Sequence, residues 1–496
     1  MSALVSFGER ISPYAFLAVV AVLVILRTLY RALFSPLSRI PGPFAAKFSS
    51  LWIVHQCRNA RRSMTLLQQH EKYGSFVRIA PNHVSISDRS ALETIYGHQS
   101  GFIKGPFYED MSRFSVEPVL FNTRDTRVHQ RKKKYLSPAF SAKNLSDYEP
   151  HMSAQIEKFM TCMHRHTQND GEFQLDFNEY CDYAFGKSFG FLDKEEDHLN
   201  LITTIDGRGE VLNALGHLPS SLRPLMKYFY LDPFWPKGLK ATSDLASIGT
   251  NAYYQRKDQQ DSRKDLLSFL FKAKDPDTGS PLSEMEIIAE SISFIVGGSD
   301  TTSSTMTNVV DIVSRSPEIQ EPLTMELDNA FPGRMSAGWV ADFQTVNQLP
   351  VLNAVVRETM RFKPTSSTGL ERVTPAGGTL IAGKFIPGGT LVSVPTLSIH
   401  HDETAFTNPE NFDISRWLDG SPSDHLNSFF PFSLGPRACI GRNFAWMEML
   451  KTLGTIFKLF SIERATTLDT EVREGFFMKN SECRVKIKKR VPNMGS

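Results

Sequence analysis

The chain has 496 residues, of which 41% are hydrophobic and 22% charged, a balance that is ordinary for a globular protein with a substantial core. Its formal net charge of +2 argues against nucleic acid as the main partner. The cysteines are far apart and none forms a Cys-x-x-Cys pair, so we expect neither a zinc site nor a disulfide framework, and a reducing compartment fits best. They are Cys57, Cys162, Cys181, Cys439 and Cys483.

An uncharged apolar run, Tyr14–Leu26, lies close to the first residue. It is shorter than the ~20 residues that span a bilayer, but apolar residues continue past Arg27 and Arg31, whose long side chains can extend to the membrane surface. A cleaved signal peptide is the alternative, although no small-residue cleavage site follows. The basic residues after the run place the rest of the chain in the cytosol. We therefore predict an uncleaved single-pass anchor in the endoplasmic reticulum membrane.

A proline-rich segment follows the apolar run and breaks its helix. No internal repeat, low-complexity tract or second linker interrupts the sequence after it. We therefore predict three parts: a membrane anchor in residues 1–35, a hinge in residues 36–43 and one folded domain in residues 44–496.

Short strands and helices alternate through the first half of this domain. Phe76–Ala80 and His83–Ser87 alternate around a Pro-Asn pair, which predicts a hairpin. Residues 97–118 contain many glycines and prolines, which predicts an irregular loop that could face a ligand. Residues 155–270 have a mostly helical pattern. Within them, residues 218–239 are aromatic and proline-rich, and we expect either ordinary core or an apolar flap lying on the membrane.

A basic helix is predicted around residues 128–140. His129 and Lys133 lie four residues apart and therefore share one helix face. We interpret Arg131 and Lys132 as a solvated basic face. The lysines beside them could attract an acidic electron-donor protein.

A much longer helix is predicted from the capping box Ser283-Glu-Met-Glu286 to Pro317. Residues 297–305 hold paired glycines and a cluster of hydroxyls, which lower helix stability and so tend to mark function. We expect the glycines to distort the helix and let a small molecule lie against the backbone, with Asp300 and Thr301 offering an acid and a hydroxyl. The alternative is that the hydroxyls bond back to helix carbonyls on a solvated face.

Another helix is predicted over Leu349–Phe362, and it carries Glu358 and Arg361. A Glu and an Arg three residues apart usually form only a weak surface pair. The segment after this helix leads through Arg372 into short strands with glycine-rich turns. Residues 476–478 and 485–487 predict a closing hairpin near the end of the chain.

The strongest chemical signal lies in residues 432–441, just before a helical run. Cys439 can bind a metal only as thiolate, and the N-terminus of the following helix offers unpaired N–H groups and a positive dipole end. Gly435 permits a turn with positive φ, and Gly441 has no side chain to keep a flat ligand away. Arg437 could reach an anionic group on the rim of that ligand.

Phe432 could cover the sulfur of Cys439 and keep water from it. A single protected thiolate is the ligand of haem iron that is to cleave dioxygen. A buried structural cysteine at a helix start is the alternative.

This stretch resembles the cysteine-ligand loop of the haem-thiolate monooxygenases, the cytochrome P-450 family. The order Gly-Gly-x-Asp-Thr-Thr in residues 297–302 resembles the oxygen-activating segment of the family. Glu358 and Arg361, followed by Pro409–Trp417, resemble its buried ion-pair network, with Arg416 as the third member and a structural role. The motifs occur in the family order and cover most of the chain.

The resemblance implies a mainly helical, single-domain fold with small β-sheets and one haem b, whose iron is bound by Cys439. Phe432, Arg437 and Gly441 would surround the haem. His129 and Lys133 stand where the family carries a tryptophan and an arginine that bind a haem propionate. Arg372 matches a further arginine with the same role.

The implied activity is monooxygenation: one oxygen atom of O2 enters a C–H or C=C bond and the other leaves as water, with Asp300 and Thr301 supplying protons. We expect residues 97–118, 203–239 and 366–370 to line the pocket. These segments are rich in Phe, Leu, Met and Pro, which suggests an apolar small-molecule substrate. The chain has no GxGxxG loop, so electrons must come from a separate protein. The resemblance implies a membrane-bound, NADPH-dependent flavoprotein reductase, with cytochrome b5 as a further candidate donor.

Residues 369–390 resemble filamentous-fungal members of the family, which implies a secondary-metabolite pathway. One alternative is a haem isomerase or dehydratase of the same fold, which has little need of Asp300 and Thr301. Another is a membrane haem-binding protein without catalysis, which the intact motifs disfavour.

Overall fold

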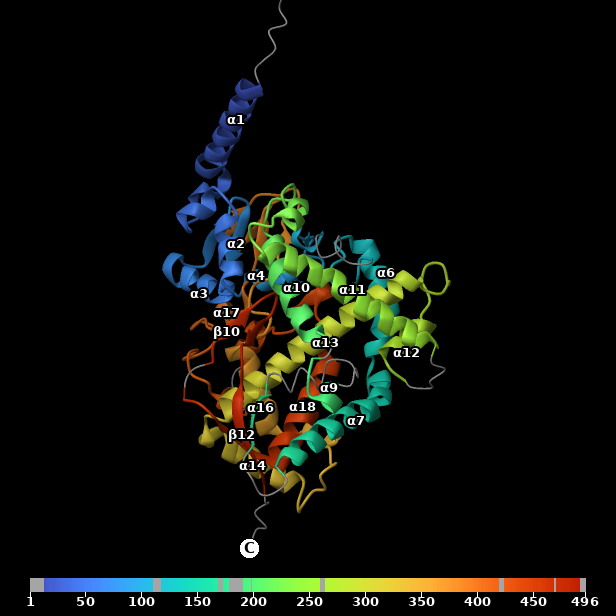
Figure 1. The fold of residues 1–496 in the computed structure, drawn as a ribbon. Helices are drawn as coiled ribbons and strands as arrows, with labels where there is room; N and C mark the ends of the chain where they lie inside the picture. The colour runs from blue at the N-terminus through green and yellow to red at the C-terminus, as the bar shows by residue number, and fades with distance from the viewer. Residues whose placement is uncertain are drawn as a thin grey trace, which may run out of the picture.

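The structure is a computed structural model that describes residues 13–109, 117–167, 173–177, 191–197, 199–258, 264–418, 423–467 and 470–490. Cys181, residues 110–116 of the predicted ligand-facing loop and the first twelve residues of the predicted anchor lie outside these ranges. Helices dominate the described chain, as predicted (Figure 1).

The α-helices differ widely in length, and α13 is the longest. They are α1 (Pro13–Phe34), α2 (Leu51–Arg58), α3 (Arg62–Tyr73), α4 (Ala91–Tyr96), α6 (Thr126–Leu136), α7 (Ala142–His166), α9 (Phe191–Lys194), α10 (Leu201–Leu215), α11 (Phe234–Asp258), α12 (Leu266–Lys272), α13 (Glu284–Val313), α14 (Pro317–Ala330), α15 (Phe343–Val346), α16 (Pro350–Phe362), α17 (Thr396–His400) and α18 (Arg442–Leu459).

The strands form small sheets, the largest in the order β1-β2-β8-β5-β3. The predicted hairpin is confirmed, because β1 and β2 pair antiparallel with Phe76 opposite Ile86. The strands are β1 (Phe76–Ala80), β2 (His83–Ile86), β3 (Ile103–Lys104), β4 (Phe173–Asp176), β5 (Arg372–Val373), β6 (Thr379–Ile381), β7 (Lys384–Ile386), β8 (Leu391–Ser393), β9 (Phe460–Arg464), β10 (Val472–Glu474), β11 (Met478–Asn480) and β12 (Arg484–Lys489).

The predicted closing hairpin is wrong. Residues 478–480 form β11, which pairs with β10, whereas residues 485–487 lie in β12, which pairs with β4 and β9. The reason is burial: Val485 and Ile487 are fully buried and belong to the main core, so β12 joins the sheet that covers this core.

Helix α13 crosses the centre of the domain and packs against α11, α16 and α18 (Figure 1). It runs from Glu284 to Val313 without interruption, so the expected distortion at the paired glycines does not break the helix. Only half of the predicted capping box forms, since Ser283 accepts the backbone N–H of Glu286 while the Glu286 carboxylate binds basic residues of α6. The C-terminal half of α13 is almost entirely buried and forms part of the main core.

Helix α1 extends away from the rest of the molecule (Figure 1). Its segment Tyr14–Phe34 is 21 residues long with a mean hydropathy of 2.1, and only 6% of its most apolar stretch is buried. This is long enough to cross a bilayer. The guanidinium of Arg78 donates to the carbonyls of Arg31 and Ala32, so the end of α1 is held by the large sheet.

The aromatic segment at residues 218–239 places many apolar side chains in solvent. Leu231 is 91% exposed, and its exposed neighbours are Leu222, Leu225, Tyr228, Phe229 and Tyr230. Trp235 and Leu239 are buried at the start of α11. The first part of the segment is therefore an exposed apolar surface rather than core, which fits the flap alternative.

Candidate functional site

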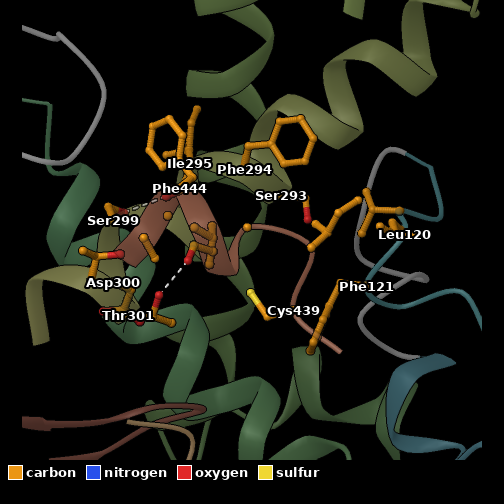
Figure 2. A pocket seen from close by; sticks show the side chains of 18 of the residues that line it. Leu120, Phe121, Ser293, Phe294, Ile295, Ser299, Asp300, Thr301, Cys439 and Phe444 are labelled. Carbon is orange, nitrogen blue, oxygen red and sulfur yellow. Dashed lines mark hydrogen bonds between the residues drawn. The ribbon is translucent and has the colours of Figure 1, made fainter. Parts of the chain in front are cut away.

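A cavity of about 690 Å³ lies beside α13. Its walls come from α6, α10, α13 and the start of α18, together with the loop that carries Cys439. Figure 2 shows Cys439, Asp300 and Thr301 around this space, with Phe121 and Phe444 also facing it. The sequence therefore brings its strongest motifs, which are more than 100 residues apart, to one cavity.

Cys439 lies two residues before the N-cap of α18, and its exposed surface lines the cavity. Its backbone N–H donates to the carbonyl of Phe432 at 2.9 Å, which closes the loop. Burial in protein raises the pKa of its thiol, while the backbone N–H of Gly441 and the charge of Arg442 oppose that rise. The sulfur thus faces the cavity with one N–H donor directed at it, and a bound metal ion would supply the charge that keeps it a thiolate.

The turn before Cys439 requires glycine at position 435. Gly435 has φ +65°, and a Cβ atom built on it would lie 2.0 Å from the carbonyl oxygen of Tyr96. Ser433 also has a positive φ, of 59°. The loop is thus pressed against the end of α4, and any larger residue at position 435 would displace it. At Gly441 the nearest atom to an added Cβ is 3.8 Å away, so space is not what requires glycine there.

Five basic side chains gather at one side of the cavity. Lys104, His129, Lys133 and Arg437 line the cavity, and Arg372 lies behind them, close enough for its charge to act on His129 and Lys104. Among the described residues none of the five forms an ion pair, and they act on one another. Burial and the charges of Arg372 and Arg437 lower the pKa of Lys104 well below its usual value. Burial, together with the surrounding cations, lowers the pKa of His129 to about 3, so this ring is neutral at pH 7.

The structure places the predicted propionate residues together but gives them other partners. Arg437 donates to the carbonyls of Thr123 and Arg124, at 2.7 and 3.2 Å, and Lys133 donates to the carbonyl of Pro436 at 2.9 Å. Arg372 is buried, and its Nη2 has no hydrogen-bond partner within the described residues.

Lys104 is a member of the cluster that the sequence did not single out. Its ammonium donates to the carbonyl of Phe121 and lies 4.3 Å from the ring centres of both Tyr108 and Phe121. The only sequence signal was its position in the predicted ligand-facing loop, so its role could not be inferred before the fold was known.

These residues fit a haem. The group is flat, its iron takes one thiolate, and its rim carries two carboxylates that need cations or hydrogen-bond donors. The cavity offers one cysteine. Near it, within the described residues, lie a buried guanidinium nitrogen without a hydrogen-bond partner and cations that form no ion pair. The other described cysteines, Cys57, Cys162 and Cys483, are buried and do not line the cavity.

Asp300 and Thr301 lie on the part of α13 that borders the cavity. The Thr301 hydroxyl donates to the carbonyl of Gly297 at 2.8 Å, so the back-bonding alternative describes its hydrogen bond correctly. The helix face is not solvated, however, because residues 289–302 line the cavity. Asp300 lies 3.5 Å from Lys479, which also pairs with Asp206. Burial raises the pKa of Asp300 despite the nearby ammonium, which brings its carboxyl closer to exchanging a proton near neutral pH.

Glu448 is a further acid at the cavity that the sequence did not indicate. It lies on α18, faces α13, and accepts a hydrogen bond from Thr302. Burial raises its pKa to about 8, so it is largely protonated at pH 7. Its side chain is therefore a second proton-carrying group within the same cavity.

Glu358, Arg361 and Arg416 form a buried network. Arg361 donates to both carboxylate oxygens of Glu358, at 2.7 and 2.9 Å, and both side chains are 0% exposed. The Nε of Arg416 lies 3.4 Å from Glu358. The network thus connects α16 with the 3-10 turn Ile414–Trp417. An exposed ion pair within α16 would make no such connection.

The interpretation of Arg131 and Lys132 as a solvated face is wrong. Lys132 is only 2% exposed and pairs with Glu286 and Glu290 of α13, and Arg131 pairs with Asp275 and Glu286. These acids neutralise both cations, because α13 packs against this side of α6. Of the four basic residues at positions 131–134, only Lys134 is exposed.

Comparison with known proteins agrees with this site. The family model described as Cytochrome P450 matches residues 41–487. The benzoate 4-monooxygenase bphA of Aspergillus niger is 36% identical, over 97% of this chain and 98% of that protein. The cytochrome P450 monooxygenase BipB of Cochliobolus sativus is 30% identical, over 88% of this chain and 87% of that protein.

Among solved structures, the haem domain of cytochrome P450DA has a TM-score of 0.76 at 19% identity, covering 91% of this chain and 98% of the other. That likeness shows the fold, and the family match with the fungal relatives shows the family. The chain belongs to the cytochrome P450 family and is a fungal-type haem monooxygenase.

Proposed function

We propose that this monooxygenase binds haem b through Cys439 and oxidises an organic small molecule with electrons from a separate NADPH-dependent flavoprotein reductase. The observation that carries the proposal is the position of Cys439, whose sulfur faces a cavity bordered by a basic cluster that forms no ion pair with the described residues. Bound haem would supply dioxygen activation at its iron. The relatives carry monooxygenase names, and nothing in them favours the isomerase or the non-catalytic alternative.

The basic cluster would hold the two carboxylates of the haem. Arg372 has an unpartnered Nη2 for this purpose, and His129 can donate a hydrogen bond as a neutral ring. The charge of Arg437 acts unfavourably on that of Lys104, and an anionic group bound beside them would relieve this repulsion. Haem binding and folding of this region would therefore support each other.

Thr301 and Asp300 would carry protons into the cavity. The Thr301 oxygen already donates to a helix carbonyl, and its lone pairs remain free to hold a water molecule against α13. Asp300 connects this position to Lys479 and Asp206, and its raised pKa suits a group that takes up and releases protons. Phe432 and the apolar walls would keep other water away from the thiolate.

Helix α1 would anchor the protein in the endoplasmic reticulum membrane, with the domain in the cytosol. The exposed apolar residues at 222–231 would rest on the same membrane surface. An apolar substrate could then reach the cavity from the lipid. Cytochrome b5 would be a second candidate electron donor beside the reductase.

The names of the relatives leave the substrate class open. One relative acts on benzoate, an aromatic carboxylate, and others are described only as monooxygenases. The cavity is mostly apolar, which suits a hydrocarbon or aromatic skeleton. A role in fungal secondary metabolism is consistent with these relatives.

Removing the Thr301 hydroxyl tests this proposal. Membranes containing the protein and a flavoprotein reductase would be given NADPH, oxygen and either benzoate or a fungal extract, and NADPH use, hydrogen peroxide and oxygenated product would be measured. In Thr301→Ala we expect NADPH use to continue while product per NADPH falls and peroxide per NADPH rises, because the proton supply in the cavity is impaired.

Ser304→Ala is the matched control, since its hydroxyl also bonds back to a carbonyl of α13 but does not line the cavity. The control should leave the ratio of product to NADPH unchanged. Equal ratios in all three proteins would remove the role of Thr301. Turnover by wild type without NADPH or oxygen would overturn the monooxygenase proposal.

A further inference from the structure

Arg208 is the one side chain of α10 that brings a charge to the cavity without a partner in the described structure. Ile205, Arg208, Gly209 and Leu212 all line the cavity, and their spacing puts them on one face of the helix. No hydrogen bond or ion pair joins Arg208 to any other described residue, and burial is the sole cause that lowers the pKa of its guanidinium, to about 10. The group is therefore a cation at pH 7.

The acids closest to Arg208 in the sequence are engaged elsewhere. Asp206 pairs with Lys479, and Glu210 pairs with Arg473, so both carboxylates of this helix bind the β10–β11 hairpin. Arg208 is half-buried, and a guanidinium in that position without a counter-ion among the described residues is costly to keep. Such a group is usually retained because a bound ligand supplies the missing counter-ion.

The residues next to Arg208 in the sequence also have low helix propensity. Gly207 and Gly209 flank it in the middle of α10, although each mid-helix glycine costs about 1 kcal/mol relative to alanine. Local departures of this kind tend to mark functional positions.

Arg208 is distinct from the basic cluster assigned to haem. Burial and the charge of Arg372 lower the pKa values of Lys104, His129 and Arg437, whereas no charged group of the described residues contributes to the pKa of Arg208. The haem carboxylates therefore do not account for Arg208, and a second anion is needed.

We infer that Arg208 binds the carboxylate of the substrate, so that the enzyme acts on organic acids with an apolar skeleton. The planar guanidinium matches the two oxygens of a carboxylate, and the apolar lining contributed by Ile205, Leu212 and Leu245 would cover the rest of the molecule. This inference rests on the proposed function, because it names the substrate class of that same cavity.

The position of Arg208 on α10 also bears on which end of the acid would meet the haem. Helix α10 packs on α11, and α11 packs on α13, while Cys439 lies in the loop before α18, which packs on α13 separately (Figure 1). A molecule held at α10 by its carboxylate would therefore present its far end to the haem. We expect oxidation at carbons remote from the carboxyl group.

The test compares acids with their neutral amides. Benzoate and benzamide, and octanoate and octanamide, are titrated by calorimetry into the haem-loaded, full-length protein in detergent at pH 7.4. For wild type we expect each acid to bind about tenfold to a hundredfold more tightly than its amide. Arg208→Gln should remove most of that difference by weakening the acids and leaving the amides within about twofold.

Arg473→Gln is the matched control, because it removes an equal charge that contacts α10 at Glu210 but is 52% exposed and lies outside the cavity. It should keep the preference for acids. Arg208→Lys keeps the charge and should retain part of the preference for acids. This variant replaces Arg208→Gln in the test if Arg208→Gln does not fold. Phenyl phosphate is titrated alongside, and tighter binding of this dianion than of benzoate would overturn the assignment to a carboxylate.

An equal affinity of wild type for acids and amides, or an unchanged preference in Arg208→Gln, would overturn the inference. The proposed function is tested separately in the same preparations, through haem content and NADPH-dependent oxygenation of a neutral probe, octanamide. Loss of haem binding or of all oxygenation would count against that function. Normal oxygenation of octanamide without a preference for acids would count against Arg208 alone.

Discussion

Replacing Glu358 by alanine should destabilise the domain more than almost any other single change. The Glu358 carboxylate accepts hydrogen bonds from Arg361 twice, from the Trp417 indole at 2.9 Å and from the backbone N–H of Asp413 at 2.9 Å, with Arg416 at 3.4 Å. Removing it leaves the fully buried Arg361 guanidinium without a counter-ion. Breaking a buried ion pair in this way costs about 3–5 kcal/mol.

That cost is large against a typical total stability of about 5–15 kcal/mol. Arg361 would keep its hydrogen bonds to the carbonyls of His400, Pro409 and Asn411, so its charge would stay buried instead of moving to water. Glu358→Gln retains one acceptor oxygen and should cost less, about 1.5–3 kcal/mol for the lost charge-assisted bonds. The expected order of stability is wild type, then Glu358→Gln, then Glu358→Ala.

The assay is urea unfolding of the haem-loaded protein, followed by circular dichroism and by haem absorbance, with haem content per chain measured first. Glu410→Gln is the control, because Glu410 lies in the same region but is 74% exposed and pairs only with His401 among the described residues. It should change stability by less than about 1 kcal/mol. A Glu358→Ala protein with the yield, haem content and unfolding midpoint of Glu410→Gln would refute the reasoning.

Three further changes test the site and the anchor. Cys439→Ala should abolish the absorbance band of the reduced, carbon-monoxide-bound thiolate haem, and retention of that band would exclude Cys439 as the iron ligand. Lys104→Met should speed transfer of haem to an excess of apomyoglobin by about tenfold or more, because one buried cation facing the haem carboxylates is lost, while Lys134→Met on the exposed side of α6 should not. Deleting residues 1–35 should release much of the protein from membranes with its haem intact, and a truncated protein that cannot take up haem would contradict the assignment of α1 as an anchor.

Much of the site could be predicted because its features depend on residue types at short spacings within one segment. The turn before Cys439 needs a glycine with positive φ, and the structure gives Gly435 a φ of +65°. The pairing of Glu358 with Arg361 follows from their spacing on one helix. The burial of that pair and the approach of Arg416 depend on contacts between segments more than 50 residues apart, which only the resemblance could supply.

Other expectations failed where the outcome depended on distant neighbours. The residue pattern predicts a solvated basic run on α6, but α13 places Glu286 and Glu290 against Lys132. The final strand was paired with the wrong partner, because the choice between β11, β9 and β4 is made by burial of Val485 and Ile487. Local sequence does not say which face of a strand meets the core of a large domain.

The sequence by itself determined the turn before Cys439, the long helix with Asp300 and Thr301, and the apolar segment that forms α1. These features follow from residue type and spacing within one segment. Only the tertiary structure decided which cations lack an anionic partner among the described residues, since Lys104 joined the basic cluster and Arg208 faces the cavity. Whether a cation is paired depends on every segment that packs around it, and a buried cation without a partner is what indicates the ligand.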